Sequence, residues 1–394
     1  MLMLSTSSTP IIEATLPVVG DHLEAISGVF YETMIGENPE LLNLFSRSAQ
    51  ATGEQRSALS GAVAAYAAHL VGQGPPAAAF DHIVERIAQR HCALGIRPEQ
   101  YTMVGRYLLG AVRTVLGDAV TPPIAAAWDE VYWLFAARLI GREARLYAEA
   151  GVDGSDPWRE YVVASRIAEA DDTCSFVLTP ADGGPAPHFL PGQYITINAD
   201  LSPDGRQLRQ YSLSQAATGG TLRITVRRVP GGAVSGHLHD RVRTGDTLLV
   251  SQPFGDLTLQ PGDSPLLLVS AGVGITPMAA ILEHVARTQP AREVVAAHAE
   301  RRPERHALRA DMIANGNRLR SFQALHWYEE TDGFLDPDAL PVHPDAEVYL
   351  CGPVPFMQTV RAGLHLRGIP DERIRYEVFG SEQWRPAPEP AAAL

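Results

Sequence analysis

The first 150 residues place apolar side chains three or four positions apart, which is the spacing of one face of an α-helix. The clearest runs cover residues 23–34, 59–70 and 124–139, and mostly polar or small residues fill the positions between them. None of these runs alternates between apolar and polar residues with a period of two. This part of the chain is therefore predicted to be all-α.

The pattern changes after the Gly, Asp and Pro residues of the segment 150–158. Short runs of alternating apolar and polar residues follow at 193–198, 222–229 and 246–251, and turn sequences such as PDG, TGG and PGG separate them. Alternation with a period of two is typical of a half-buried strand, and several short strands with tight turns indicate an antiparallel sheet. We expect a small antiparallel β-barrel in this region.

A third pattern begins at about residue 261. The segment 265–270 is continuously apolar, as in a strand that is buried on both faces of a parallel sheet. Helical runs at 276–287 and near 304–314 alternate with strand-like runs at 292–299 and 347–352. Strands that alternate with helices predict an α/β domain with a doubly wound sheet. The chain is thus expected to be multidomain.

Composition narrows the classes of function. The formal net charge of −13 disfavours nucleic acid or an anionic membrane surface as a partner, because both attract basic faces. No apolar run reaches the roughly 18 residues that span a bilayer, and the N-terminus lacks the basic segment of a signal peptide. We therefore expect a cytoplasmic protein with no transmembrane segment.

The absence of lysine and the positions of the cysteines exclude several kinds of site. All 32 residues counted as Lys or Arg are arginines, which excludes Schiff-base chemistry and any phosphate loop that depends on a lysine. The three cysteines, Cys92, Cys174 and Cys351, lie far apart, so neither a disulfide framework nor a thiolate zinc site is indicated.

One histidine occupies a position where an apolar side chain would pack better. In the segment ERIAQRHCALGIRPEQY (85–101), His91 shares a helix face with Ala88. Gly95 and Pro98 end this helix, and the next one begins at Pro98. A single inward histidine is more often a packed core residue than a ligand, so this position alone does not identify a metal site.

The sequence SAGVGITPM (270–278) joins the buried strand to the following helix. Gly272 and Gly274 allow the backbone to approach a diphosphate, and the start of the helix supplies N–H groups. Pro277 stands where the usual dinucleotide-binding fingerprint has its third glycine. Taken alone, the two glycines are also compatible with a simple tight turn.

A second motif, RQYSL (209–213), has an arginine and a tyrosine two positions apart, on the same face of a strand. The guanidinium of Arg209 is a fork-shaped partner for a diphosphate, and the ring of Tyr211 could stack on a flat cofactor. An ordinary strand with a surface arginine and a core tyrosine explains this motif equally well by itself.

Six motifs together are far more specific than either alone. In chain order they are PGQY (191–194), RQYS (209–212), GGAVSGHL (231–238), GVGITP (272–277), CGP (351–353) and EVFG (377–380). This ordered set resembles the ferredoxin-reductase family, in which an FAD-binding barrel precedes a nicotinamide-binding domain.

That resemblance implies the cofactor contacts of the reductase. Arg209 and Ser235 would hold the FAD diphosphate, Tyr211 and Ser212 would address the isoalloxazine, and Phe379 would cover its opposite side. Tyr194 would help to frame the flavin, and the GVGITP loop would take the nicotinamide dinucleotide. The full implied set is Tyr194, Arg209, Gln210, Tyr211, Ser212, Ser235, Gly272, Val273, Gly274, Ile275, Thr276, Pro277, Val378, Phe379, Gly380 and Ser381.

The helical part has features of a globin pocket. Phe45 follows a helix after a short turn, where a globin packs a phenylalanine on the porphyrin. Tyr31 lies on an inner helix face, and Gln55 opens the next helix. The order of globin, FAD barrel and nicotinamide domain resembles the flavohaemoglobins, the bacterial and yeast nitric oxide dioxygenases. By this resemblance His91 is the proximal ligand of a haem b iron, and Phe45 also contacts the haem.

The same resemblance implies four catalytic residues. Tyr101 and Glu143, the latter in GREARLY (141–147), would converge beside His91 and give its imidazole imidazolate character. Electron density pushed to the iron in this way activates bound O₂. Tyr31 and Gln55 would stabilise that O₂ from the other side.

We therefore expect a globin domain at 1–149, an FAD-binding β-barrel at 157–260 and an NAD(P)-binding α/β domain at 261–394. The expected activity is nitric oxide dioxygenation, in which NAD(P)H reduces FAD, FAD reduces haem, and haem-bound O₂ converts NO to nitrate. The alternatives are a ligand-binding or sensor globin with its own reductase, and a hydroperoxide or quinone reductase. The chain is expected to be a monomer whose partners are the small substrates NO and O₂.

Two departures from the family and one open choice complete the expectations. Arg90 stands where the family usually has lysine, and Val378 replaces a more usual cysteine; Arg90 and Glu377 are expected to tune redox potentials. In AERRPER (299–305), Glu300 would suit the free ribose hydroxyl of NADH, whereas either following arginine would suit the 2′-phosphate of NADPH.

Overall fold

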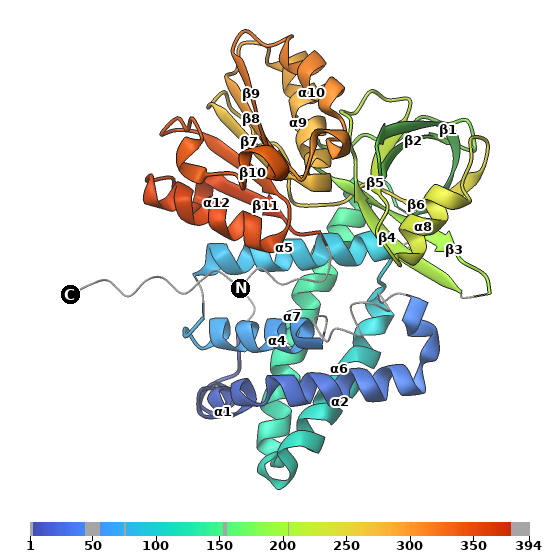
Figure 1. Ribbon diagram of the computed structural model, residues 1–394. Helices are drawn as coiled ribbons and strands as arrows, with labels where there is room; N and C mark the ends of the chain where they lie inside the picture. Colours follow the sequence, from blue (N-terminus) through green and yellow to red (C-terminus); the bar gives the residue numbers. More distant parts are fainter. Residues whose placement is uncertain (1–2, 44–55, 75, 153–155, 204, 380–394) are drawn as a thin grey trace. The chain divides into compact units, whose positions relative to one another are not determined.

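The computed structural model describes residues 3–43, 56–74, 76–152, 156–203 and 205–379. The chain forms two compact units (Figure 1). One contains residues 1–158 with 205–208, and the other contains residues 159–204 with 209–394.

The first unit is helical, as the apolar spacing predicted. Helix α2 packs against α4 and α6, and α5 packs against α7, so that their apolar faces enclose the core. The predicted runs 23–34, 59–70 and 124–139 lie within α2, α4 and α7. The helices are α1 (Thr9–Asp21), α2 (Leu23–Glu37), α4 (Arg56–Leu70), α5 (Ala77–Leu94), α6 (Pro98–Leu116) and α7 (Pro122–Glu149), with 3₁₀ turns at Pro39–Asn43 and Gly117–Ala119.

The junction between α5 and α6 has the predicted form. Helix α5 ends at Gly95, whose φ of 71° is in the left-handed region that glycine adopts without strain. Helix α6 then starts at Pro98, and the side-chain oxygen of Gln100 accepts a hydrogen bond from the N–H of Arg97 at 2.8 Å. These caps fix where His91 lies, one turn before the end of α5.

The second unit contains most of a six-stranded sheet in the order β4-β3-β6-β1-β2-β5; only Trp158 of β1 and residues 206–208 of β4 are counted with the first unit. An antiparallel bridge between Leu213, just after β4, and Ile224 of β5 joins its two ends, so the sheet curls into the expected barrel. The strands are β1 (Trp158–Ala170), β2 (Thr173–Pro180), β3 (Tyr194–Asp200), β4 (Arg206–Ser212), β5 (Leu222–Arg227) and β6 (Thr247–Ser251), and helix α8 (Ala233–Asp240) follows β5.

The alternation of apolar and polar residues did not predict strands β1 and β2. Two irregularities shift the register of β1 against β2, one between Val163 and Ser165 and one between Ala168 and Ala170. Such bulges interrupt the period of two by which a strand is recognised in a sequence. In β2 the first four residues are all buried, the polar Thr173 and Ser175 included, so this part of the strand has no exposed polar face.

The rest of the second unit is a five-stranded parallel sheet in the order β11-β10-β7-β8-β9. Apolar side chains of α9 and α10 pack on one face of this sheet, and those of α12 pack on the other. The elements are β7 (Leu266–Ala271), α9 (Ile275–Thr288), β8 (Val294–Glu300), α10 (Arg309–Gly316), β9 (Phe322–Tyr328), α11 (Glu329–Asp332), β10 (Glu347–Cys351), α12 (Val354–Leu366) and β11 (Ile374–Glu377).

The helix expected near 304–314 was wrongly placed. The structure has a 3₁₀ turn at Pro303–Arg305 and starts α10 only at Arg309. Leu308, between them, has a φ of 57°, which a right-handed helix cannot contain. The helix therefore begins after this residue.

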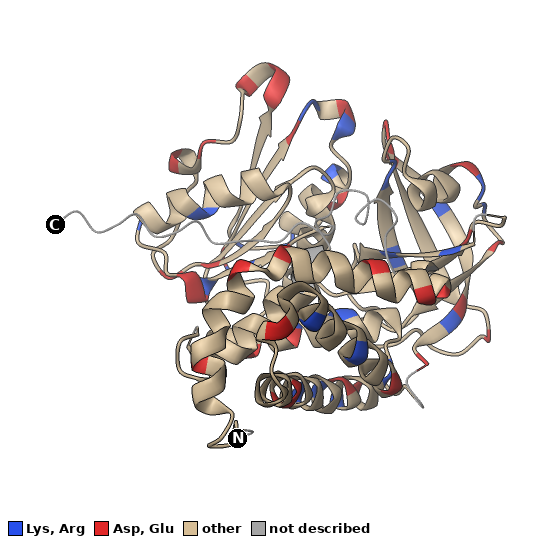
Figure 2. Cartoon of the chain, turned by 90° about the horizontal axis from the view of Figure 1, so that it is seen from below, with Lys and Arg blue, Asp and Glu red and all other residues tan. Residues whose placement is uncertain are grey.

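Charge and hydropathy do not mark a site by themselves. Acidic residues and arginines are intermixed over the part of the chain that the structure describes (Figure 2). Within those residues no helix is long and apolar enough to cross a membrane. The chemistry has to be sought among buried polar side chains.

Candidate functional site

Three polar side chains from three helices meet inside the helical unit. Nδ1 of His91, on α5, lies 2.8 Å from Oε1 of Glu143 on α7 and 2.9 Å from the hydroxyl of Tyr101 on α6. The Tyr101 hydroxyl also donates to the same Glu143 oxygen at 2.5 Å. Only 2% of Glu143 is exposed. The structure thus brings together the proximal residues that the sequence singled out.

The protonation of this group follows from its geometry. Burial, followed by the nearby Glu143 carboxylate, raises the pKa of the Tyr101 hydroxyl, so it stays protonated and acts as a donor. The Nδ1–H of His91 donates to Glu143, which leaves Nε2 with its lone pair. A neutral imidazole with Nδ1 engaged and Nε2 available is the donor that binds haem iron. The residues present therefore fit a haem.

The helical periodicity of the sequence did not predict the residues that hold this group in place. The hydroxyl of Tyr132, on α7, donates to the backbone oxygen of Tyr101 at 2.5 Å. Gly105 allows the approach, because a Cβ there would lie 2.4 Å from the Tyr132 ring. A bidentate pair between Arg142 and Glu85 joins α7 to α5, with the shorter contact at 2.6 Å. Gly105, a glycine inside a helical run, was the one feature of the sequence that could have indicated this close contact with Tyr132.

Of the other residues expected at the haem, Tyr31 lies in the part of the chain that the structure describes. Tyr31 lies on α2, and its ring meets that of Phe30 edge to face with centroids 4.7 Å apart. Burial raises the pKa of Tyr31 to about 12. Phe45 and Gln55 lie outside the described residues, so their predicted roles stay predictions.

The predicted flavin residues lie on β3 and β4 of the barrel. Tyr194 begins β3, and Gly255 packs against its ring, since a Cβ there would lie 3.0 Å from two ring carbons. Arg209 and Tyr211 are two residues apart on β4 and flank Gln210. Burial lowers the pKa of Arg209 and raises that of Tyr211, so both groups are partly withdrawn from water.

Ser212 gives an observation that points to a ligand. Its Oγ is buried and has no hydrogen-bond partner among the residues that the structure describes. Buried hydroxyls are normally satisfied, so a group outside the protein is expected to bond it. Ser235 lies in the first turn of α8, and its hydroxyl accepts from the N–H of Val229 at 3.1 Å. The unpartnered hydroxyl of Ser212 fits a polar cofactor beside the end of β4.

The GVGITP loop has the close packing that its glycines suggested. It runs from the carboxyl end of β7 through a 3₁₀ turn at Gly272–Gly274 into α9, whose first residues include Ile275, Thr276 and Pro277. A Cβ on Gly274 would lie 2.3 Å from the backbone oxygen of Cys351. Gly272 has a φ of 56°, and a Cβ there would lie 2.8 Å from the guanidinium of Arg227. The loop, with Val273 at its centre, lies at the sheet edge where open α/β sheets bind ligands.

The remaining predicted residues lie at the end of β11. Glu377 is buried and pairs in register with Cys351 of the parallel strand β10. Val378 is buried and Phe379 is 40% exposed. Gly380 and Ser381 lie outside the described residues. Burial and Glu377 raise the pKa of the Cys351 thiol, which makes it inert as a nucleophile at neutral pH.

The residues that bear on nicotinamide choice are engaged within the chain. Glu300 ends β8, and its Oε1 accepts from the N–H of Arg301 at 2.9 Å. The same oxygen lies 3.7 Å from the guanidinium of Arg227. Arg302 pairs with Asp171 at 2.9 Å.

Three family models match successive parts of the chain. A globin model matches residues 28–139, an oxidoreductase FAD-binding domain matches 160–259, and an oxidoreductase NAD-binding domain matches 268–362. The expected order of an all-α globin, an antiparallel β-barrel and an α/β nicotinamide-binding domain is therefore confirmed.

Comparison over the full length decides the family. The flavohemoprotein of Bordetella pertussis is 41% identical over 402 aligned positions, which cover 96% of this chain and 99% of that protein. The chain belongs to the flavohaemoglobin family. The flavohemoprotein of Rhizobium meliloti is 38% identical with the same coverage.

Solved structures agree with this assignment. The flavohaemoglobin of Malassezia yamatoensis, which has bound FAD and haem, superposes with a TM-score of 0.88 at 36% identity and covers 96% of this chain. The FAD/NAD-binding domain of the nitric oxide dioxygenase of Vibrio cholerae superposes with a TM-score of 0.53 at 37% identity over 56% of this chain.

As a flavohaemoglobin, the chain joins a globin to an oxidoreductase with FAD- and NAD-binding domains. The predicted set of haem, FAD and nicotinamide cofactors is thereby confirmed. Arg90, which directly precedes His91 in α5, stays a predicted modulator of the haem potential.

Proposed function

We propose that this flavohaemoglobin is a nitric oxide dioxygenase that oxidises NO to nitrate with O₂ and electrons from NADH or NADPH. The observation that carries the proposal is the buried group of His91, Tyr101 and Glu143. Burying a carboxylate is costly unless it is hydrogen-bonded, and a globin that only stores O₂ does not need one beside its proximal histidine.

The residues of this group have distinct tasks. Glu143 accepts the Nδ1–H of His91 and so increases electron density at Nε2, the atom proposed to bind the haem iron. Tyr101 donates to the same oxygen and orients the carboxylate. When bound, haem supplies the site of O₂ activation, and FAD converts hydride transfer into single-electron transfers.

The opposite side of the pocket requires a hydrogen-bond donor. The Tyr31 hydroxyl stays protonated at neutral pH because its pKa is about 12. It can therefore donate to a ligand that carries partial negative charge, and Gln55 is proposed as the second donor. In the reductase, Arg209 and Ser235 are proposed to hold the FAD diphosphate, and the Gly272–Gly274 loop to take the nicotinamide.

The electron balance makes the proposal quantitative. One NAD(P)H provides two electrons, so two NO and two O₂ yield two nitrate ions, one NAD(P)⁺ and one proton. The test is to measure the oxidation of NADH and NADPH by the haem- and FAD-loaded chain, with O₂ and with NO, a hydroperoxide or a quinone in turn. We expect NO to give the fastest turnover, with two nitrate ions for each nicotinamide oxidised.

A pair of variants ties the activity to the proximal group. Tyr101→Phe should slow NO-dependent turnover. Tyr107→Phe is the control: Tyr107 is also on α6, but its hydroxyl donates to Glu37 of α2, so this change should leave the turnover unaltered. Faster turnover with a hydroperoxide or a quinone would instead indicate a reductase of those compounds. Tight O₂ binding without nitrate formation would indicate a sensor or ligand-binding globin.

A further inference from the structure

The turn between β1 and β2 of the barrel carries two aspartates that contact the NAD-binding domain. The carboxylate of Asp171 pairs with Arg302 at 2.9 Å, and its backbone N–H donates to the oxygen of Glu304 at 3.1 Å. The backbone oxygen of Asp172 accepts from the N–H of Arg228 at 2.7 Å, which fixes the turn beside the end of β5. Both aspartates lie outside the six motifs that resemble the reductase family.

The carboxylate of Asp172 joins two arginines from different elements. Its Oδ2 accepts from Nε of Arg227, the last residue of β5, at 3.1 Å. The same oxygen accepts from Arg305, in the 3₁₀ turn after β8, and Oδ1 accepts from the hydroxyl of Thr173 at 3.0 Å. Burial acts to raise the pKa of Asp172, but Arg227, Thr173 and Arg305 together lower it below its usual value. The carboxylate is therefore ionised at neutral pH.

Arg227 connects this carboxylate to the Gly272–Gly274 loop. Strand β5 contacts the loop, and a Cβ on Gly272 would lie 2.8 Å from Nη1 of Arg227. The guanidinium thus fills the space that a side chain at this position would need, and it lies against the loop backbone. On its other side, Nη2 of Arg227 lies 3.7 Å from Oε1 of Glu300 at the end of β8. Arg227 therefore lies between the loop and the residue expected to face the ribose.

The loop is held from two sides, and only one of them depends on the barrel. A Cβ on Gly274 would lie 2.3 Å from the backbone oxygen of Cys351, which is a contact within the NAD-binding domain. The contact at Gly272 is made by Arg227, a long side chain whose orientation has to be fixed by its partners. Asp172 and Glu300 both pair with this guanidinium, and Asp172 is the closer of the two.

We propose that Asp172 is a positioning residue for the nicotinamide dinucleotide, because it fixes Arg227 against Gly272 and so keeps the loop in the conformation that accepts the diphosphate. This inference rests on the proposed role of the Gly272–Gly274 loop in nicotinamide binding. The second partner of Asp172, Arg305, anchors the turn after β8 to the same carboxylate. Asp172 acts through these arginines and does not itself contact the dinucleotide.

The binding of NAD⁺ to the oxidised full-length protein, loaded with haem and FAD, tests this role. Asp172→Asn keeps the shape of the side chain and removes the charge that holds Arg227. The two side chains are 23% and 26% exposed, and the loss of such an ion pair changes an equilibrium constant by up to about fivefold. We expect the Kd of NAD⁺, measured by calorimetry, and the KM for NADH each to rise by about this factor. The rate of FAD reduction at saturating NADH should stay the same, because Asp172 affects binding.

Three further variants separate positioning from a general loss of stability. Asp182→Asn removes another barrel carboxylate, which pairs with Arg159 at 2.9 Å, and should leave both constants unchanged. Asp172→Glu keeps the charge and should retain most of the affinity. Arg227→Gln should raise the Kd at least as much as Asp172→Asn, so the test does not depend on the folding of one variant. In the Arg227→Gln background, Asp172→Asn should have no further effect.

Two results would overturn the role of Asp172. One is a Kd for NAD⁺ that equals that of wild type in Asp172→Asn or in Arg227→Gln. The other is a rise caused by Asp172→Asn that persists in full in the Arg227→Gln background. Gly274→Ala, measured beside these variants, separates this inference from the proposed function. An unchanged KM for NADH in Gly274→Ala would refute the nicotinamide role of the loop, whereas a raised KM there and none in Asp172→Asn would refute only the role of Asp172.

Discussion

Replacing Glu143 by glutamine removes one negative charge from the proximal group and keeps its shape. Glutamine can still accept from the Tyr101 hydroxyl and from Nδ1 of His91 through its Oε1. Because the substituted side chain is nearly isosteric and lies in a fully enclosed position, the helical packing should survive. The effect should therefore be electronic.

The size of the effect follows from the two hydrogen bonds. A hydrogen bond to a charged group contributes about 1.5–3 kcal/mol and one between neutral groups about 0.5–1.5 kcal/mol, so each bond should weaken by ~1 kcal/mol. Ferric iron benefits more than ferrous iron from an electron-rich imidazole. A loss of about 1–2 kcal/mol in that preference raises the haem potential by ~40–85 mV, because 59 mV corresponds to a tenfold change for one electron.

Two measurements on the purified holoprotein test this reasoning. Spectroelectrochemical titration gives the haem potential, and the resonance Raman frequency of the ferrous iron–histidine stretch reports the donor strength of the imidazole. We expect a higher potential, a lower stretching frequency and slower nitrate formation. Asp81→Asn is the matched control, because it removes a carboxylate from α5, the helix of His91, that pairs with Arg138 and does not contact Nδ1. A potential and frequency equal to those of wild type would refute the electronic role of Glu143.

Four further changes test other parts of the molecule. His91→Ala should abolish tight haem binding, measured by the Soret absorbance, and leave FAD reduction by NADH intact; retained haem would contradict the ligand assignment. Arg209→Ala should lower the FAD content on purification, because a charge-assisted contact of roughly 1.5–3 kcal/mol is lost; full occupancy would count against its diphosphate role. Gly274→Ala should raise the KM for NADH severalfold, since its Cβ would meet the backbone oxygen of Cys351 at 2.3 Å and displace the loop; an unchanged KM would show that the loop does not contact the nucleotide. Burial lowers the pKa of His306 to about 3, below the ~6.5 of a histidine in the unfolded chain. As the pH falls, the unfolded state therefore takes up the proton first. The free energy of unfolding should fall by ~1.4 kcal/mol per pH unit between about pH 6.5 and 3. Urea titrations at pH 7 and 5 should show a smaller loss for His306→Gln than for wild type, and equal losses would disprove this linkage.

The sequence alone determined the features that depend on local geometry. Gly95 and Pro98 end one helix and start the next because only particular backbone angles suit these residues, and this places His91 on an inner helix face. The helical runs and the buried parallel strands were predictable for the same reason, since each element buries the side chains that its own period brings to one face. The ordered motifs then indicated the family.

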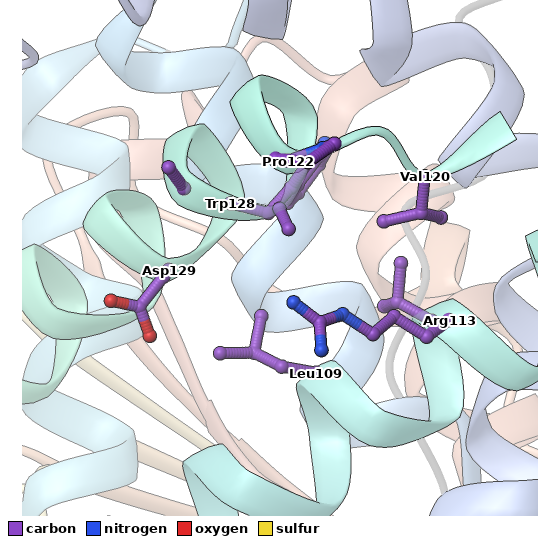
Figure 3. A pocket seen from close by; sticks show the side chains of 9 residues that line it. Leu109, Arg113, Val120, Pro122, Trp128 and Asp129 are labelled. Atoms are coloured by element: carbon purple, nitrogen blue, oxygen red, sulfur yellow. The ribbon is translucent and has the colours of Figure 1, made fainter. Parts of the chain in front are cut away.

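Only the tertiary structure decided what the buried groups do. Tyr101 and Glu143 lie 10 and 52 residues from His91, and their convergence on Nδ1 depends on how α5, α6 and α7 pack. Periodicity gives the face of a helix but not its neighbours, so the family resemblance, and not the pattern, had suggested this contact. The bulges of β1 and the φ of Leu308 likewise come from packing that overrides local preference. The structure also has an open pocket of about 320 Å³ between α6 and the start of α7 (Figure 3). It exists for the same reason, because it is the space that side chains from distant segments leave between them, and no segment contains that information by itself.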